Sequence, residues 1–220
     1  MPARAIIFDC DGVLVDSEVI YLEVERTLLA QIGLTYEPVA YKERFIGLTM
    51  PDFFAELRAD FAERGEGTFP EDFEHQVISQ SMARIEKELQ TIAGVEDVLH
   101  AFDGAKAVAS SSQIDKLHKK LEITNLHHHF NPHIYSGDEV ARGKPAPDLF
   151  LHAAEKIGHA PSACIAIEDS ANGVRSAVAA GMTVWGFTGG GHADDGLARR
   201  LKAAGAHEVF ESFAEVSAKL

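Results

Sequence analysis

The chain has 220 residues and carries 34 acidic against 20 basic side chains, which gives a formal net charge of −14. This charge argues against nucleic acid and anionic membrane surfaces as partners, because both require a basic face on the protein. The length suits one large domain, or a core with a small inserted domain.

The cysteines and the first residues indicate the compartment. Cys10 and Cys164 both stand in apolar, strand-like runs, so we expect no disulfide framework and a reducing compartment. Asp9 and Asp11 interrupt the only early apolar run, which argues against a signal peptide. No apolar run approaches the roughly 18 residues of a membrane span. We therefore expect a cytoplasmic protein.

The first predicted element is a buried strand at residues 4–8, which ends in two acids. Asp9 and Asp11 stand two residues apart, and Gly12 follows directly. Two carboxylates at one strand exit repel each other unless a positive charge is held there. Cys10 lies between them, but strand alternation turns its side chain the other way, so we expect it to be buried and unreactive.

The next part of the chain contains helical patterns and no convincing strand. The patterns cover residues 17–33, 51–65 and 70–90. An all-helical block inside an α/β chain is best explained as an inserted small domain. We therefore predict a discontinuous α/β catalytic core at residues 1–17 and 89–220, and a helical domain at residues 18–88.

Strands and helices alternate through the rest of the chain. The β-rich runs cover residues 105–110, 133–137, 164–169, 183–187 and 207–210. The helical patterns between them cover residues 94–102, 114–123, 148–158, 170–181 and 196–205. Most strand runs are continuously apolar, as in strands that helices cover on both faces. The alternation predicts a doubly wound parallel sheet, a Rossmann-like α/β fold.

Polar residues collect where these strands end, which is where open parallel sheets bind ligands. Besides the first two acids, they are Ser110, Ser111, Ser112, Lys144, Glu168, Asp169 and Ser170. Ser112 is expected to cap the helix that follows it. The Gly-rich run at 188–192 is expected to form a loop near the same edge. Four carboxylates on one edge repel one another unless a hard cation neutralises them, and oxygen ligands in an incomplete cage favour Mg²⁺.

Such a set of groups suits phosphoryl transfer. That reaction needs a nucleophile, a cation, hydrogen-bond donors for the equatorial oxygens and a proton donor for the leaving group. A carboxylate can serve as the nucleophile and form an acyl phosphate.

Four motifs resemble the haloacid dehalogenase superfamily, in the branch that holds sugar-phosphate phosphatases and β-phosphoglucomutase. They are DCDGVLVDS at 9–17, VASSS at 108–112, GKPAPD at 143–148 and IEDSANGV at 167–174. The stretch FDCDGVLVDSEVI also looks like phosphatases of sugars and sugar acids, including those that act on 6-phosphogluconate. The resemblance implies a Mg²⁺-dependent phosphoric monoester hydrolase for small phosphorylated metabolites, in which the helical domain is a cap that closes over the site.

The resemblance also implies a role for each motif residue. Asp9 matches the nucleophile that becomes aspartyl-phosphate, and Asp11 matches the general acid/base, whose backbone carbonyl binds the metal. Glu168 matches either a metal ligand or an acid just behind the ligands. In full, the implied site residues are catalytic Asp9, Asp11 and Lys144; phosphate-binding Gly12, Ser110, Ser111 and Lys144; and metal-binding Asp9, Asp11, Glu168 and Asp169.

Three other functions can be compared with this one. A true dehalogenase lacks the second acid of the first motif, and this chain has Asp11. A phosphosugar mutase of the β-phosphoglucomutase type is the alternative, although such mutases carry arginine where Met50 stands and histidine where Tyr21 stands. Arg44 could substitute, but it precedes the expected position. A phospho-accepting signalling domain is a remote alternative, because there the accepting aspartate ends the third strand and no cap interrupts the first connection.

The motifs leave the substrate itself unspecified. In this family the cap and its loops choose it. The cap residues that could face the cleft are, without ranking, Tyr21, Glu25, Arg44, Thr49 and Met50. The oligomeric state is open, with a monomer as the default.

Overall fold

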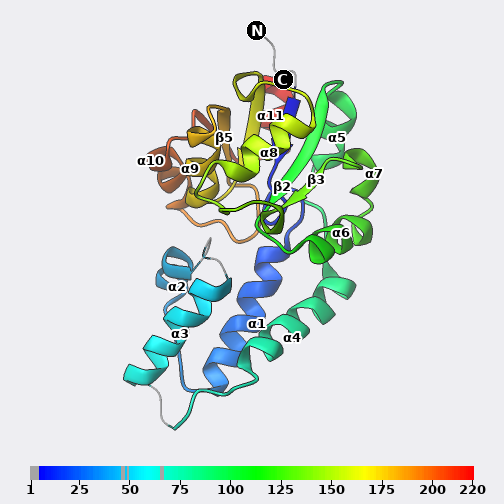
Figure 1. Cartoon of the computed structure of the whole chain (residues 1–220). Helices are drawn as coiled ribbons and strands as arrows, with labels where there is room; N and C mark the ends of the chain where they lie inside the picture. The colour runs from blue at the N-terminus through cyan, green and yellow to red at the C-terminus, as the bar shows by residue number, and fades with distance from the viewer. Residues whose placement is uncertain (1–4, 46–47, 49, 65–66) are drawn as a thin grey trace. The chain divides into compact units, whose positions relative to one another are not determined.

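The computed structural model describes residues 5–45, 48, 50–64 and 67–220, without the side chain of Glu43. The chain divides into two compact units (Figure 1). The α/β unit comprises Met1–Asp16 and Leu89–Leu220, and the helical unit comprises Ser17–Glu88. That the helical unit acts as a cap stays a prediction.

The α/β unit is built on one six-stranded, wholly parallel sheet. Its strands are β1 (Ala5–Phe8), β2 (Ala105–Ser110), β3 (Ile134–Ser136), β4 (Cys164–Glu168), β5 (Thr183–Phe187) and β6 (Glu208–Phe210). Their order across the sheet is β3-β2-β1-β4-β5-β6. Each strand lies in one of the runs predicted from the sequence, and the predicted α/β fold is confirmed.

Helices lie between these strands and after the last of them. In the described residues of this unit they are α5 (Val95–Ala101), α6 (Ile114–Ile123), α7 (His127–Phe130), α8 (Asp148–Lys156), α9 (Ala171–Ala179), α10 (Leu197–Ala204) and α11 (Phe213–Lys219). Short 3₁₀ turns lie at Gly137–Glu139 and Pro161–Ala163. The sequence did not predict α7 and α11, because one or two turns are too short to show a helical period. Tertiary packing fixes α11, since Phe213 lies against Phe187 with ring centroids 4.6 Å apart.

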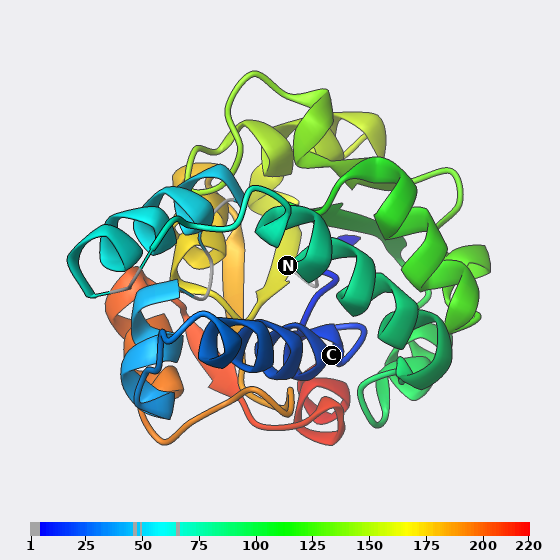
Figure 2. The same ribbon diagram turned by 90° about the horizontal axis from the view of Figure 1, so that it is seen from below.

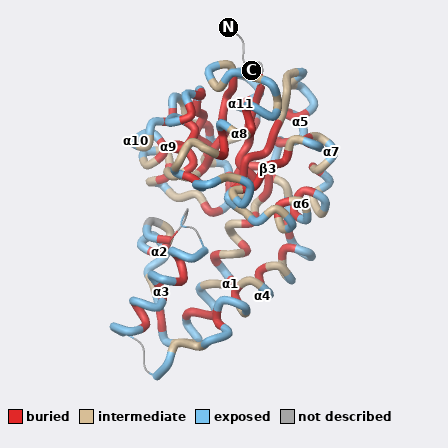
Figure 3. Tube along the Cα trace, in the orientation of Figure 1, coloured by how far each residue is buried: buried red, intermediate tan, exposed pale blue. Residues whose placement is uncertain are grey.

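Different helices cover the two faces of the sheet (Figures 1 and 2). Ile7 belongs to the apolar cluster that includes Leu149 of α8. Phe8, the next residue, points to the opposite face and meets Phe130 of α7, with ring centroids 5.7 Å apart. The strands are accordingly buried along almost their whole length (Figure 3). Burial on both faces explains why the strand runs read as continuously apolar.

Both cysteines follow the expectation from the sequence. Cys10 and Cys164 are free and buried. Burial raises the pKa of each thiol, which keeps both in the unreactive protonated form.

The helical unit contains α1 (Ser17–Gln31), α2 (Pro38–Phe45), α3 (Met50–Arg64) and α4 (Phe73–Glu88). The sequence predicted three helices here, and α2 is a correction. Among its described side chains only Tyr41 and Phe45 are buried, one turn apart, which is too little for a recognisable period. Across the described residues of both units, no helix has the length and apolar character that crossing a membrane requires.

Asp60 of α3 connects its helix to α2 and to the segment that precedes α2. Its carboxylate accepts hydrogen bonds from Tyr36 at 2.7 Å, Arg44 at 2.7 and 2.9 Å, and Arg64 at 2.5 Å. Arg44 also donates to Glu56 at 2.6 and 3.1 Å. These charge-assisted bonds lower the pKa of Asp60 against the effect of its partial burial.

The burial pattern of α8 gives a test of the fold with a matched control. Leu149 is fully buried and Leu151, two residues on, is 41% exposed. Leu149→Ala should lower the free energy of unfolding by about 2–5 kcal/mol, because the lost contacts leave a cavity. Leu151→Ala should change it by less than about 0.5 kcal/mol. Urea unfolding followed by the fluorescence of Trp185, the single tryptophan, reports on the α/β unit. Equal losses in the two variants would contradict the placement of α8.

Candidate functional site

The candidate site lies where the order of the strands reverses. From β1 the chain proceeds to β2 and β3 on one side, then returns to β4 on the other side of β1. In open α/β sheets such a switch point opens a crevice at the carboxyl ends of the strands. Asp9 directly follows β1, and its amide donates to the carbonyl of Ile167 at 2.9 Å. Glu168 ends β4, so the acids of the first and fourth motifs meet at this point.

Lys144 forms hydrogen bonds with groups at the ends of three strands. Its ammonium donates to Asp9 Oδ1 at 2.6 Å, to Glu168 Oε1 at 2.5 Å and to the carbonyl of Ala109 at 2.8 Å. Burial by itself lowers the pKa of Lys144, but Asp9 and Glu168 outweigh it and hold that pKa above its usual value. The lysine is therefore a fixed positive charge among three neighbouring strands.

Three buried carboxylates surround this charge. Asp9, Glu168 and Asp169 each offer an oxygen within 4.8 Å of the others, so together they could hold a metal ion. The pKa of Asp9 rises to about 7, first because of burial and further because of Glu168 and Asp11, although Lys144 opposes the rise. One lysine thus does not neutralise the group. An all-oxygen donor set with excess negative charge fits a hard divalent cation such as Mg²⁺.

Glu168 is held from two sides. Opposite Lys144, its second oxygen accepts hydrogen bonds from the amide of Ser170 at 3.1 Å and from its hydroxyl at 3.0 Å. The same hydroxyl caps α9, where it accepts from the amide of Gly173 at 3.0 Å. A Cβ at Gly173 would lie only 1.8 Å from Glu168 Oε1. The glycine of the fourth motif therefore makes room for the carboxylate.

Gly12 allows the loop after β1 to approach the fourth motif. Its φ of +76° favours glycine, and a Cβ there would lie 1.9 Å from Asp169 Oδ2. His192, in the loop after β5, is also buried and places Nε2 3.2 Å from the same oxygen. The Gly-rich run at 188–192 is thus a loop at the site, as expected from the sequence. The specific contact of His192 was not predicted.

The carboxylate of Asp11 contacts other side chains than the three buried carboxylates do. The hydroxyl of Ser112 donates to Asp11 Oδ2 at 2.7 Å, and Lys120 of α6 forms an ion pair with Asp11 Oδ1. Lys120 also donates to the hydroxyl of Ser112 at 2.9 Å. The sequence analysis missed Lys120. The available signal was a lysine three residues after the buried Leu117, on the apolar face of α6.

The prediction for Ser112 was wrong. Gln113 occupies the N-cap position of α6 without a capping hydrogen bond from its own side chain, and the carboxylate of Asp138 accepts from the amide of Ile114 at 3.3 Å. The hydroxyl of Ser112 is already shared by Asp11 and Lys120. A side chain engaged at the sheet edge does not turn back toward the first amides of its helix.

The other serines of the second motif differ in burial. Ser110 is buried, and its hydroxyl accepts from the amide of Ser112 at 3.1 Å and lies 3.5 Å from Asp11 Oδ2. Ser111 is exposed at the same strand end. Ser110 therefore lies with the predicted acids, whereas no hydrogen bond among those of the described residues joins the side chain of Ser111 to them.

The residues of the helical unit that were predicted to face the cleft differ in their exposure and in their hydrogen-bond partners. Glu25 accepts a hydrogen bond from the Tyr41 hydroxyl at 2.8 Å, and Met50 is exposed. Arg44 is engaged by Glu56 and Asp60, and Thr49 lies outside the described residues.

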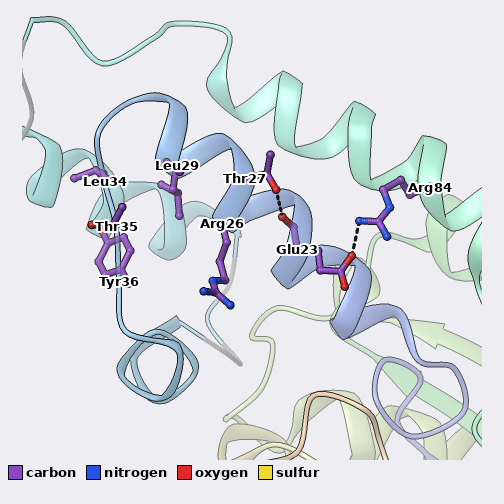
Figure 4. Close-up of a pocket in the computed structure, with 9 residues that line it drawn as sticks. Glu23, Arg26, Thr27, Leu29, Leu34, Thr35, Tyr36 and Arg84 are labelled. Atoms are coloured by element: carbon purple, nitrogen blue, oxygen red, sulfur yellow. Dashed lines mark hydrogen bonds and ion pairs between the residues drawn. The ribbon is translucent and has the colours of Figure 1, made fainter.

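A separate pocket of about 470 Å³ lies within the helical unit (Figure 4). Its lining consists of Glu23, Arg26, Thr27, Leu29, Ala30, Leu34, Thr35, Tyr36 and Arg84. Arg84 is paired there with Glu23 at 2.8 Å, and the Thr27 hydroxyl donates to the carbonyl of Glu23 at 2.7 Å. None of the residues predicted for the site lines this pocket.

Known proteins resemble the chain over most of its length. Residues 3–181 match the haloacid dehalogenase-like hydrolase family. A 6-phosphogluconate phosphatase from Escherichia coli (strain K12) is 31% identical over 189 residues, which cover 86% of this chain and 84% of that protein.

Two solved structures share the fold. A conserved haloacid dehalogenase-like protein from Agrobacterium tumefaciens superimposes with a TM-score of 0.89 and 34% identity, over 99% of this chain and 97% of that one. A hydrolase of the same family from Deinococcus radiodurans R1, with bound phosphate and sodium, gives a TM-score of 0.81 and 34% identity, over 98% and 93%.

These likenesses confirm the family predicted from the four motifs, and the phosphatase relative supports the predicted class, a phosphoric monoester hydrolase. Because the family match spans most of the sequence and the four motifs lie together in the α/β unit, the chain belongs to the haloacid dehalogenase-like hydrolase family.

Proposed function

We propose that this chain is a Mg²⁺-dependent phosphatase that hydrolyses small phosphorylated sugars or sugar acids through an aspartyl-phosphate on Asp9. The observation that carries the proposal is the buried ammonium of Lys144, which holds Asp9 and Glu168 within one group of acidic side chains. The group combines a fixed nucleophile with an excess of oxygen ligands. The 6-phosphogluconate phosphatase and the phosphate-bound hydrolase among the similar proteins support the substrate class.

In the first step, an oxygen of Asp9 forms a bond to phosphorus while the bond between phosphorus and the leaving oxygen breaks. The bonding pair stays with the leaving oxygen, which takes a proton from the carboxylic acid form of Asp11 and departs as an alcohol, and Asp11 becomes the carboxylate that pairs with Lys120. Lys144 keeps the Asp9 carboxylate oriented for this attack. Ser110, at the neighbouring strand end, supplies a hydroxyl for the phosphoryl oxygens, and the exposed Ser111 and the tight turn at Gly12 offer further contacts.

In the second step, water attacks the phosphorus of the aspartyl-phosphate and gives its proton to Asp11. The bond between phosphorus and the Asp9 oxygen breaks, so that Asp9 returns as a carboxylate and inorganic phosphate is released. Asp11 has then given one proton and regained one, and the net reaction consumes one phosphate ester and one water.

Asp9, Asp169 and the backbone carbonyl of Asp11 would hold the Mg²⁺, and Glu168 would bind or support it. The ion would neutralise the charge on the phosphoryl oxygens. The carboxylates fit such an ion because three of them lie within 4.8 Å of one another and Lys144 balances only one charge.

The mutase alternative is not favoured. A mutase must bind the far phosphate of a bisphosphate, which requires a cation on the cap. Met50 carries no charge, and Arg44 is already bound to both Glu56 and Asp60. With neither residue available for a second phosphate, water is free to capture the phosphoenzyme.

The first test of this function is the loss of the nucleophile. With Mg²⁺, the purified chain should release phosphate from at least one of 6-phosphogluconate, glucose 6-phosphate and fructose 1-phosphate. Asp9→Asn should abolish this release, because an amide is nearly isosteric but forms no acyl phosphate. Asp115→Asn, at an exposed position on α6, is the matched control and should keep wild-type kcat. Retention of more than about a tenth of wild-type kcat by Asp9→Asn, a loss under about 1.4 kcal/mol, would show that Asp9 is not the nucleophile.

The second test removes the metal. Excess EDTA should silence phosphate release, and added Mg²⁺ should restore it, because the acidic group needs a cation to accept an anionic substrate. Ca²⁺ should inhibit, since its larger and looser coordination misplaces the phosphoryl group relative to Asp9. Full activity in excess EDTA would refute the metal requirement.

The third test separates the phosphatase from the mutase. The protein is incubated with β-glucose 1-phosphate, a trace of glucose 1,6-bisphosphate and Mg²⁺. Free phosphate should appear faster than glucose 6-phosphate, and release should not depend on the bisphosphate. The reverse order of products would establish the mutase instead.

A further inference from the structure

The mechanism above gives no function to the buried charge of Lys120 in the α/β unit. Lys120 has an exposed fraction of 0% although it carries an ammonium group. A lysine removed from water is destabilising unless a carboxylate and further hydrogen bonds compensate its desolvation. The surroundings of Lys120 supply that compensation from the site itself.

Lys120, Asp11 and Ser112 form a closed triangle of polar contacts. The ammonium contacts Asp11 Oδ1 and donates to the Ser112 hydroxyl at 2.9 Å. That hydroxyl donates to Asp11 Oδ2 at 2.7 Å. Both oxygens of Asp11 are therefore engaged, and rotation of the carboxylate breaks at least one of these contacts.

The triangle is anchored in the core of the α/β unit. Lys120 lies on α6 between Leu117 and Leu121, which are both fully buried. Asp11 belongs instead to the loop after β1, and its side chain is 13% exposed. The rigid partner is thus the lysine, and the partner that must be held is the acid. Lys144 holds Asp9 in the same way from another part of the sheet edge.

We infer that Lys120, with Ser112, is a positioning residue that keeps the Asp11 carboxyl group aimed at the leaving oxygen of the substrate. The inference rests on the proposed function, in which Asp11 passes a proton to that oxygen. Lys120 itself touches neither the phosphoryl group nor the leaving group in this scheme. Its effect is confined to the proton transfer.

This assignment predicts a loss that depends on the leaving group. An alkoxide needs a proton as it departs, and a well-placed general acid contributes about 10²–10⁴-fold to such a step. A p-nitrophenolate ion leaves without a proton. The quantity kcat/KM includes phosphoryl transfer to Asp9 and excludes the later hydrolysis, which both substrates share.

The experiment compares Lys120→Met with wild type on two substrates. One is p-nitrophenyl phosphate, and the other is whichever of 6-phosphogluconate, glucose 6-phosphate or fructose 1-phosphate the wild type hydrolyses fastest. For the sugar phosphate, kcat/KM should fall by about 10²-fold, which is the cost of a misplaced catalytic group. For p-nitrophenyl phosphate, it should stay near the wild-type value. Methionine has a similar length and suits a buried position.

Two further variants keep the test decisive. Ser112→Ala removes one side of the triangle and leaves the lysine, so it should give the same selective loss at a smaller size, even if Lys120→Met folds poorly. Lys119→Met is the matched control, because it makes the same change at an exposed neighbour on α6 and should alter neither substrate.

The outcomes separate this inference from the function on which it rests. An equal fall on both substrates in Lys120→Met and Ser112→Ala would overturn the positioning role and indicate structural support or phosphate binding. Unchanged kinetics in both variants would also overturn it. A wild type that hydrolyses neither substrate would instead refute the proposed phosphatase.

Discussion

The site depends on the ion pairs of one buried lysine. Lys144 lies 135 positions from Asp9 along the chain and 24 from Glu168, yet its ammonium binds both carboxylates within 2.6 Å. Buried acids of like charge at a switch point are destabilising unless a cation separates them. The lysine provides that separation only when β1, β2 and β4 are paired in order. The geometry of the site therefore depends on the pairing of these three strands.

The charges around the switch point bear on whether the site could hold a metal ion. Four carboxylates, from Asp9, Asp11, Glu168 and Asp169, face two ammonium groups, from Lys144 and Lys120. When all four acids are ionised, four minus two leaves two negative charges, the charge of one divalent cation. The raised pKa of Asp9 agrees with this excess of negative charge, because burial without a full counter-charge favours the neutral acid. Each of the two acids of the first motif also has its own lysine, which fits the separate roles that the proposed function gives to Asp9 and Asp11.

Much of this could be read from the sequence, because the signals are local. Short β-rich runs, most of them continuously apolar, predicted all six strands, and the acids and serines stand at their ends, with Lys144 in the loop after β3. Lys120 could not be placed in the same way, since it lies 109 residues from Asp11 and only the fold brings them together. Ser112 was assigned to a helix cap for the same reason, because its true partner is not a neighbour in the chain. The short helices α2 and α11 were missed because packing, not periodicity, stabilises them.

The pairing of Arg44 and Arg84 in the helical unit bears on the choice between the proposed hydrolysis and the mutase alternative. An arginine that already donates to carboxylates gains little from a phosphate, because it must first give up charge-assisted bonds. Arg44 is bound by Glu56 and Asp60, and Arg84 is bound by Glu23 and Glu88. These guanidinium groups connect neighbouring helices. Breaking their ion pairs costs free energy, which would oppose the binding of a second phosphate. Under the proposed mechanism, a phosphoenzyme without a bound bisphosphate is open to water, so these ion pairs support the proposed hydrolysis over the mutase alternative.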